Sequence, residues 1–238
     1  MRLLAVDSSG LVASVAIMTE DTLIAEYSVN HKKTHSQTLM PMLDEIVRMT
    51  ESRLSDFDYL AVAGGPGSFT GLRIGSATVK GLGLALNIPV VSVPTLEALA
   101  MNICDSEYLV CPLMDARRSQ VYTGIYHFED GRMQVDMGQI PMDIHDLMQK
   151  IKKYNRKVVF LGDGVPVYQG VIENEMSNSY LLAPAHLNRQ RASAVGMRAW
   201  DYVREGKVQT AAEHAPEYLR LSQAERERME REKAGSHG

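Results

Sequence analysis

A glycine-rich segment around residue 68 is the part of the sequence best suited to chemistry or binding. Its members are Gly65, Pro66, Gly67, Ser68, Phe69, Thr70 and Gly71. It follows a short apolar run and precedes a long helical pattern, so it offers free N–H groups at the positive end of a helix, where an anion or a partner can bind. It can equally be a tight turn in which Ser68 or Thr70 caps the helix. The lysine of a Walker phosphate-binding loop is absent from it.

Two further short segments could form a nucleotide site. Asp7 and Ser8 follow the first apolar run, where a carboxylate can help to hold magnesium and phosphate. Gly162 and Gly164 follow a later apolar run and could form a second phosphate loop. Both segments can instead be simple turns. Since no lysine or arginine is placed convincingly for phosphates in any of these loops, we expect weak ATP binding or none, and no bound cofactor.

The histidine and cysteine residues do not indicate a metal site or a nucleophile. His31 and His35 have the i, i+4 spacing of metal ligands, but Thr34 between them resembles a helix cap and no HExxH motif is present. Cys104 and Cys111 lack metal-type spacing and are expected to be reduced thiols. The sequence also contains no GxSxG nucleophile elbow. We therefore expect no metal ligand and no catalytic residue.

Composition and charge restrict the class of protein. Of the 238 residues, 45% are hydrophobic, which is enough for one large domain or two smaller ones. The formal net charge of −4 argues against a chain that binds nucleic acid by itself. Asp7 interrupts the N-terminal apolar run too early for a signal peptide, and no run approaches the roughly 18 apolar residues of a membrane span. The expected location is the cytoplasm.

The periodic patterns predict one succession of elements twice: three strands, a helix, a strand and a helix. In the first half the expected strands are 3–6, 12–18, 22–29 and 59–63, with helices from residue 34 and up to about residue 87. In the second half the strands are 108–114, 120–127, 133–140 and 158–161, with helices at 143–153, 165–176 and 192–204. This order predicts an α/β fold of two ribonuclease H-like domains in an actin-like arrangement.

The predicted boundaries divide the chain into three parts. We expect a first domain at residues 1–104, a second at 105–212, and a C-terminal segment with a charged tail at 213–238. In the tail, Glu227 and Arg231 are spaced to pair on a helix. Pro41 either kinks the first helix or lies in its first turn.

The two N-terminal helices are candidates for a protein interface. The helix after the glycine-rich segment contains Gly75, Gly81 and Gly83, each of which costs about 1 kcal/mol relative to alanine, and it is apolar nearly all round. Its own sheet can cover one side. The other side could be covered by the C-terminal segment or by a second protein. The residues we expect at such an interface are His35, Leu39, Met42, Arg73, Ile74, Ala77 and Lys80.

Several motifs resemble those of one family, and together they cover essentially the whole chain. They are LLAVDSS, HSQTLMPML, GGPGSFTGLRIG, IPVVSVPTLEALA, MDARRSQVY and PEYLR. The chain is similar to the TsaB (YeaZ) family, and the GPGSFTGLR block is the most specific of the motifs. The resemblance implies an actin-like scaffold or dimerisation subunit without transferase activity of its own. It implies a heterodimer with the catalytic TsaD through the first two helices, with TsaE as a further ATPase partner. The expected role is threonylcarbamoylation of adenosine 37 in tRNAs that read codons starting with A, with tRNA contacted through the complex.

One departure from the related TsaD pattern concerns the metal ligands. TsaD-like relatives carry an HxxxH motif after the strand that corresponds to Val90 and Val91, where this chain has Thr95 and Leu99. Neither residue replaces a histidine ligand, so the resemblance implies no catalytic metal. A homodimer is expected when TsaD is absent. The alternative hypothesis is an enzyme, either an actin-like ATPase or a glycoprotease-type peptidase.

Overall fold

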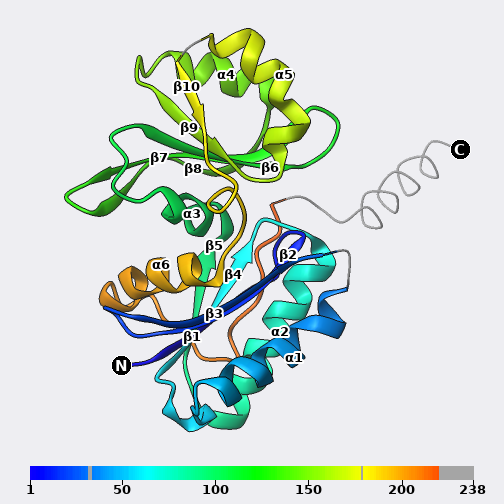
Figure 1. The fold of residues 1–238 in the computed structure, drawn as a ribbon, viewed down its shortest axis with the longest axis vertical. Coiled ribbons are helices and arrows are strands. Elements are labelled where there is room, and N and C mark those ends of the chain that lie inside the picture. The colour runs from blue at the N-terminus through cyan, green and yellow to red at the C-terminus, as the bar shows by residue number, and fades with distance from the viewer. Residues whose placement is uncertain (32–33, 178, 220–238) are drawn as a thin grey trace, which may run out of the picture.

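Two five-stranded sheets form the framework of the protein (Figure 1). The structure is a computed structural model that describes residues 1–31, 34–177 and 179–219. The predicted charged tail, with Glu227 and Arg231, lies outside the described residues. The first sheet has the strand order β3-β2-β1-β4-β5 and the second has the order β10-β9-β6-β7-β8.

The first sheet begins with an antiparallel meander and continues with parallel strands. Its strands are β1 (Leu3–Asp7), β2 (Val12–Met18), β3 (Leu23–Asn30), β4 (Tyr59–Gly65) and β5 (Val90–Pro94). Helix α1 (His35–Met49) and the short 3-10 helix η1 (Leu54–Asp56) connect β3 to β4, and α2 (Phe69–Leu86) connects β4 to β5. Pro41 lies inside α1, beyond its first turn, and the helix continues through it.

The second sheet repeats this order. Its strands are β6 (Leu109–Asp115), β7 (Gln120–Glu129), β8 (Arg132–Asp143), β9 (Val158–Leu161) and β10 (Tyr180–Leu182), with helices α4 (Ile144–Lys152) and α5 (Gly164–Met176). In both sheets the first strand pairs antiparallel with the second and parallel with the fourth. The predicted pair of ribonuclease H-like domains is therefore confirmed.

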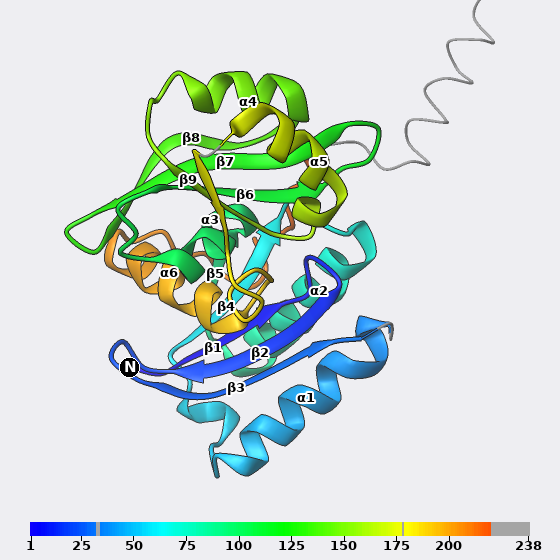
Figure 2. The same ribbon diagram turned by 45° about the horizontal axis from the view of Figure 1, so that its top comes forward.

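Helices cover both faces of the first sheet, which explains why β1 reads as an unbroken apolar run. All five residues of β1 are buried. Leu4 and Val6 pack towards α1 and α2, while Leu3 and Ala5 pack against α6 (Ala192–Arg204). In Figure 2, α6 lies on one face of the first sheet and α1 and α2 lie on the other. A strand that is buried on both faces needs apolar residues at every position rather than at alternate ones.

Helix α6 packs on the first sheet although it follows the second domain in the chain. Trp200 in α6 is almost fully buried, and its indole N–H donates a hydrogen bond to the Thr19 carbonyl. Its ring lies edge-to-face with the ring of Tyr59 in β4, with the ring centroids 6.0 Å apart. The expected second-domain range of residues 105–212 thus includes a helix that completes the core of the first domain.

Helix α3 (Thr95–Ala100), continued by the 3-10 helix η2 (Met101–Ile103), links the two domains. Leu96 and Leu99 pack against Val110 and Tyr126 of the second sheet. On its other side α3 contacts α6, where the Glu97 carboxylate accepts hydrogen bonds from Arg198 at 2.7 Å and from the Tyr202 hydroxyl at 2.9 Å. Within the described ranges, no helix is long and apolar enough to cross a membrane.

We expect Trp200→Ala to lower the free energy of unfolding by about 3–5 kcal/mol, because it removes the largest buried side chain between α6 and the first sheet. Met197 lies on the same helix with 44% of its surface exposed, so Met197→Ala is the matched control and should cost less than about 1 kcal/mol. Urea denaturation measures both variants. Equal effects of the two changes would show that α6 is not part of this core.

Candidate functional site

The glycine-rich segment packs directly on the turn that follows β1. The Ser68 N–H donates a hydrogen bond of 2.7 Å to the Ser9 carbonyl oxygen. A Cβ atom added at Gly67 would lie 2.3 Å from that same oxygen, and one added at Gly71 would lie 2.0 Å from the Ser8 carbonyl oxygen. Cβ atoms do not approach carbonyl oxygens so closely, so glycine at both positions is required by the approach of two backbone segments.

The start of α2 is bonded within the chain. Ser68 is the N-cap of α2, and its hydroxyl accepts a hydrogen bond from the Gly71 N–H at 3.3 Å. The Ser8 hydroxyl in turn donates to the Gly71 carbonyl at 2.8 Å. Because the chain itself makes these contacts, the geometry favours the tight-turn interpretation of the segment over an open phosphate cradle.

Asp7 is a buried carboxylate at the end of β1. The Ser9 N–H and the Ser9 hydroxyl both donate to its Oδ1 atom, at 2.8 and 2.7 Å. Burial raises the pKa of Asp7 to about 6, while these two hydrogen bonds and the nearby His35 oppose the rise. His35 joins α1 to the same turn, because its Nε2 atom lies 2.8 Å from the Gly10 carbonyl oxygen. No group of three or more metal-binding side chains is found in the described part of the chain.

The second candidate phosphate loop packs inside its own domain. Gly162 has a positive φ of 106°, and a Cβ atom there would lie 2.1 Å from the Leu113 carbonyl oxygen of β6. Its own carbonyl accepts a hydrogen bond from Arg189 at 3.0 Å. Gly164 begins α5 and also packs on Leu113. The structure therefore brings Asp7 and Ser8 together with the glycine-rich segment, and it places Gly162 and Gly164 against β6.

A C-terminal strap, defined as residues 208–219, lies along α2. Gln209 pairs with Val90 through two backbone hydrogen bonds at the edge of the first sheet. The Lys80 ammonium then donates to the carbonyl oxygens of Ala212 and His214, at 2.8 and 3.0 Å. At the far end, the Glu217 N–H donates to the Gly64 carbonyl at 2.7 Å. The strap therefore covers one flank of α2 along much of its length.

Aromatic stacking joins the strap to the start of α2. The rings of Phe69 and Tyr218 stack with their centroids 4.1 Å apart. The Arg73 guanidinium lies 4.6 Å from the centre of the Phe69 ring, and its Nε donates to the Tyr218 hydroxyl at 3.3 Å. The sequence analysis did not identify Tyr218 as a functional residue. Two features of the sequence could have indicated a contact at Tyr218: the PEYLR motif that contains it, and the apolar residues on nearly all sides of α2.

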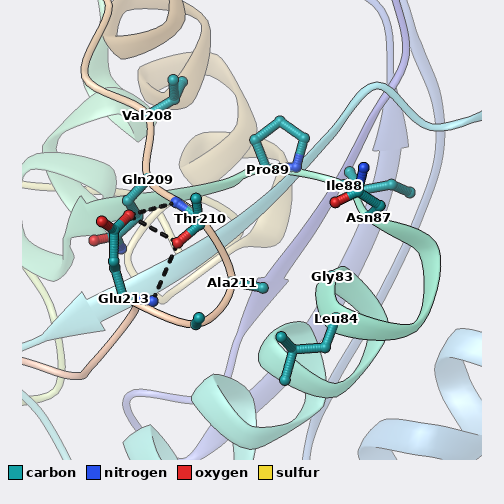
Figure 3. A pocket seen from close by; sticks show the side chains of 11 residues that line it. Gly83, Leu84, Asn87, Ile88, Pro89, Val208, Gln209, Thr210, Ala211 and Glu213 are labelled. Carbon is teal, nitrogen blue, oxygen red and sulfur yellow. Dashed lines mark hydrogen bonds between the residues drawn. The ribbon is translucent and has the colours of Figure 1, made fainter.

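A groove of about 530 Å³ lies beside the contact between the strap and the last turn of α2 (Figure 3). Leu84, Asn87 and Ile88 line it on the helix side, opposite strap residues that include Thr210 and Glu213. The Glu213 carboxylate accepts hydrogen bonds from the N–H and the hydroxyl of Thr210, which lowers the pKa of Glu213. These bonds hold the turn of the strap that forms one wall of the groove.

The expected interface residues divide between the core and the surface. Leu39 and Met42 are buried in the core of the first domain, because they lie on the α1 stripe that faces the sheet, so they support the outer surface without forming part of it. Ala77 and Arg73 are exposed on α2. The partly buried members are His35, Ile74 and Lys80.

The outer surface of α1 and α2 carries apolar and small residues. Met40 on α1 has 49% of its surface exposed, and Leu84 on α2 has 59% exposed. Gly81 and Ala85 are also exposed. We call the surface formed by Met40, Ala77, Gly81, Leu84 and Ala85 the helical face. In Figures 1 and 2, α1 and α2 lie side by side on the outer side of the first sheet.

Thr95 and Leu99, the positions compared with metal ligands, have packing roles. Thr95 is buried at the start of α3, where its hydroxyl accepts a hydrogen bond of 3.1 Å from the Gly65 N–H. Leu99 lies in the core between the two domains. Both side chains therefore fix α3 and the glycine-rich segment to the surrounding structure.

Comparison with known proteins gives consistent matches over most of the chain. A family model described as TsaD, tRNA N6-adenosine threonylcarbamoyltransferase, matches residues 22–228. The tRNA threonylcarbamoyladenosine biosynthesis protein TsaB of Bacillus subtilis is 34% identical, over 98% of this chain and 100% of that protein. The protein of the same description from Escherichia coli is 30% identical, over 92% of this chain and 95% of that protein. The solved structure of YeaZ from Pseudomonas aeruginosa is 27% identical and covers 92% of this chain and 99% of that one, with a TM-score of 0.79.

We expect the buried Asp7 to lower stability at neutral pH. Its pKa is raised in the folded state, so protonation favours folding; the stabilisation is fully present below the ordinary pKa of 3.8 and is lost as the pH rises through about 6. Asp7→Asn keeps an oxygen that can accept from Ser9 but cannot ionise. The stability of Asp7→Asn relative to the wild type should therefore rise by about 2.5 kcal/mol between about pH 4 and pH 7.5. Urea denaturation at the two pH values measures this difference, and a difference that does not change with pH would contradict the assignment.

Proposed function

The chain belongs to the TsaB family and acts in the biosynthesis of threonylcarbamoyladenosine in tRNA, and we propose that it does so as a non-catalytic subunit that binds a TsaD-type transferase. In this role it is a scaffold whose helical face docks the catalytic subunit. The modified position is adenosine 37 of tRNAs that read codons starting with A, and the complex works in the cytoplasm with TsaE as a further member.

The contacts of α3 support a non-catalytic role. Thr95 and Leu99 occupy the positions where TsaD-like relatives carry a pair of histidines. In this chain the Thr95 hydroxyl accepts a hydrogen bond from the Gly65 N–H, and Leu99 packs in the core. Neither a threonine hydroxyl committed to a backbone N–H nor a leucine can take the place of a histidine ligand. The close packing of the loops at Gly67 and Gly162 likewise argues against the alternative of an independent actin-like ATPase.

The docking proposal rests on the open space beside Gly81 in α2. Glycine inside a helix costs about 1 kcal/mol relative to alanine, so its presence calls for a compensating contact. At Gly75 and Gly83 the chain supplies that contact, since an added Cβ atom would lie 2.4 Å from the Ser8 hydroxyl oxygen or 2.6 Å from the Ala211 Cβ. At Gly81 no described atom lies within 4 Å of the added Cβ. Gly170 on α5 is open in the same way, so the open glycine supports docking only together with its surroundings. Gly81 lies among the exposed residues Ala77, Leu84 and Ala85 of α2, and a partner helix could approach closely there.

The proposed function predicts that modification requires two proteins. Purified chain, the TsaD of the same organism, or both would be incubated with threonylcarbamoyl-adenylate and unmodified tRNA, together with TsaE and ATP. We expect threonylcarbamoyladenosine only when both proteins are present, because this chain lacks a catalytic site of its own. Nucleoside analysis by mass spectrometry measures the product. Full modification by either protein alone would contradict the proposal.

Ala77→Glu should abolish complex formation without unfolding the chain. In the free protein the new carboxylate would be exposed, one turn from Arg73 and from Lys80. In the complex it would be desolvated and would block the close approach of a partner at residue 77, which should weaken binding at least about tenfold. Gly81→Leu should act in the same way by filling the space reserved for a partner. Gel filtration and calorimetry with TsaD measure binding, and thermal unfolding reports on the fold.

The matched control for Gly81 is Gly170, because it is also an exposed helical glycine without a described atom near its added Cβ, but it lies on α5 of the second domain. Gly170→Leu should leave the complex intact. If Ala77→Glu unfolds the protein, the helical face is core rather than interface. If folded Ala77→Glu and Gly81→Leu bind TsaD normally, the partner docks elsewhere.

A further inference from the structure

Helix α2 carries an unbalanced positive charge. Its 18 residues include two ionisable side chains, Arg73 and Lys80, and both are cations. They lie on either side of Ala77, about one turn away in each direction. Among the residues that the structure describes, neither cation forms an ion pair. The middle of the helical face is therefore flanked by two charges that form no ion pair with the described residues.

Uncharged groups hold both cations in place. The Lys80 ammonium donates to the carbonyl oxygens of Ala212 and His214 in the strap. The Arg73 guanidinium lies over the Phe69 ring and donates to the Tyr218 hydroxyl. Carbonyl oxygens, a phenol and an aromatic ring fix the direction of a cation without cancelling its charge. The strap thus orients the two charges in advance, which lowers the entropy cost of using them in a contact.

The charges on α1 do not offset those on α2. Arg48 and Glu45 form an ion pair within α1 at 2.5 Å, and Asp44 is the one further carboxylate on that helix. The strap carboxylates keep their charge but do not pair with either cation: Glu213 accepts from Thr210, and Glu217 accepts from Gln139 of β8 at 3.2 Å. The contact region around Ala77 therefore presents cations to any partner.

We propose that the helical face selects a partner helix with carboxylates on both sides of the residue that meets Ala77, and that Arg73 and Lys80 pair with these carboxylates. This inference rests on the proposed function, because it specifies the chemistry of the partner at the same site. It also predicts that an acidic transferase subunit binds the helical face more tightly than a second copy of this chain does, because of their charges.

Self-pairing through α2 brings like charges together. In an antiparallel two-fold contact centred on Ala77, residue 73 of one copy lies level with residue 81 of the other. Arg73 then lies one residue, about 1.5 Å along the axis, from the level of Lys80 of the second copy. The contact repeats this at its other end by symmetry. Repulsion at both ends makes the homodimer less stable than the complex with an acidic partner. The protein thus gains specificity by disfavouring the wrong pairing.

Salt dependence separates the two assemblies. Full-length chain would be titrated with the TsaD of the same organism at about 50 mM and about 500 mM NaCl, and its self-association would be measured by analytical ultracentrifugation at the same two concentrations. We expect the dissociation constant of the complex to rise at least about tenfold with salt, because screening removes the attraction. Self-association should tighten or stay the same, because screening removes the repulsion.

Charge variants test the two residues directly. Arg73→Gln should weaken the complex about three- to tenfold and reduce its salt dependence. Lys80→Gln should do the same, whereas Lys80→Arg keeps the charge and should restore binding; this comparison separates loss of charge from loosening of the strap. Arg132→Gln is the control, because Arg132 is an exposed cation on β8 in the second domain.

The outcomes distinguish this inference from the proposed function. If wild-type chain and TsaD form no complex at either salt concentration, both fail. If the complex forms but is insensitive to salt and to Arg73→Gln, the acidic-partner inference is overturned and the docking proposal stands. Self-association that weakens as salt rises would also overturn the inference.

Discussion

The close contact between the turn after β1 and the start of α2 is the constraint on which the arrangement of the first domain depends. Backbone meets backbone there, and the contact exists only because Gly67 and Gly71 have no side chains. Ser68 caps the helix at the same place, and Ser8 holds the Gly71 carbonyl. The direction of α2 is therefore set at its first turn. Everything that α2 presents to the outside, the cations included, follows from that direction.

The surface of α2 divides into three parts. Val79 packs into the core of the first sheet, and the strap covers the flank that carries Lys80. The remainder is the helical face around Ala77, which the described chain leaves open. The two explanations considered for an all-round apolar helix, the chain's own C-terminal segment and a second protein, are thus not exclusive. The strap accounts for one flank, and the proposed partner accounts for the other.

Local patterns were sufficient to predict most of the elements and the duplicated fold, because alternating or helical apolar periodicity decides whether a short segment becomes a strand or a helix. The short elements α3 and β10 were not predicted. Local patterns were not sufficient for relations between distant segments. The return of α6 to the first sheet is decided by which apolar face remains uncovered, and the sequence of α6 does not encode that. The burial of Met42 depends on its angular position about α1. The strap is held by bonds from Lys80 to backbone carbonyls, and such bonds leave no pattern in the residue types.

The position of α6 also affects the order in which the domains are completed during synthesis. The second sheet and its helices are built from a continuous stretch of chain between β6 and β10. The first sheet needs Ala192–Arg204 to cover its second face, and those residues are made after the whole second domain. On the ribosome, an apolar surface that includes Leu3 and Ala5 therefore stays uncovered while the second domain emerges. The N-terminal half of this chain is made first but finished last, and during that interval it is the part that most needs protection from aggregation.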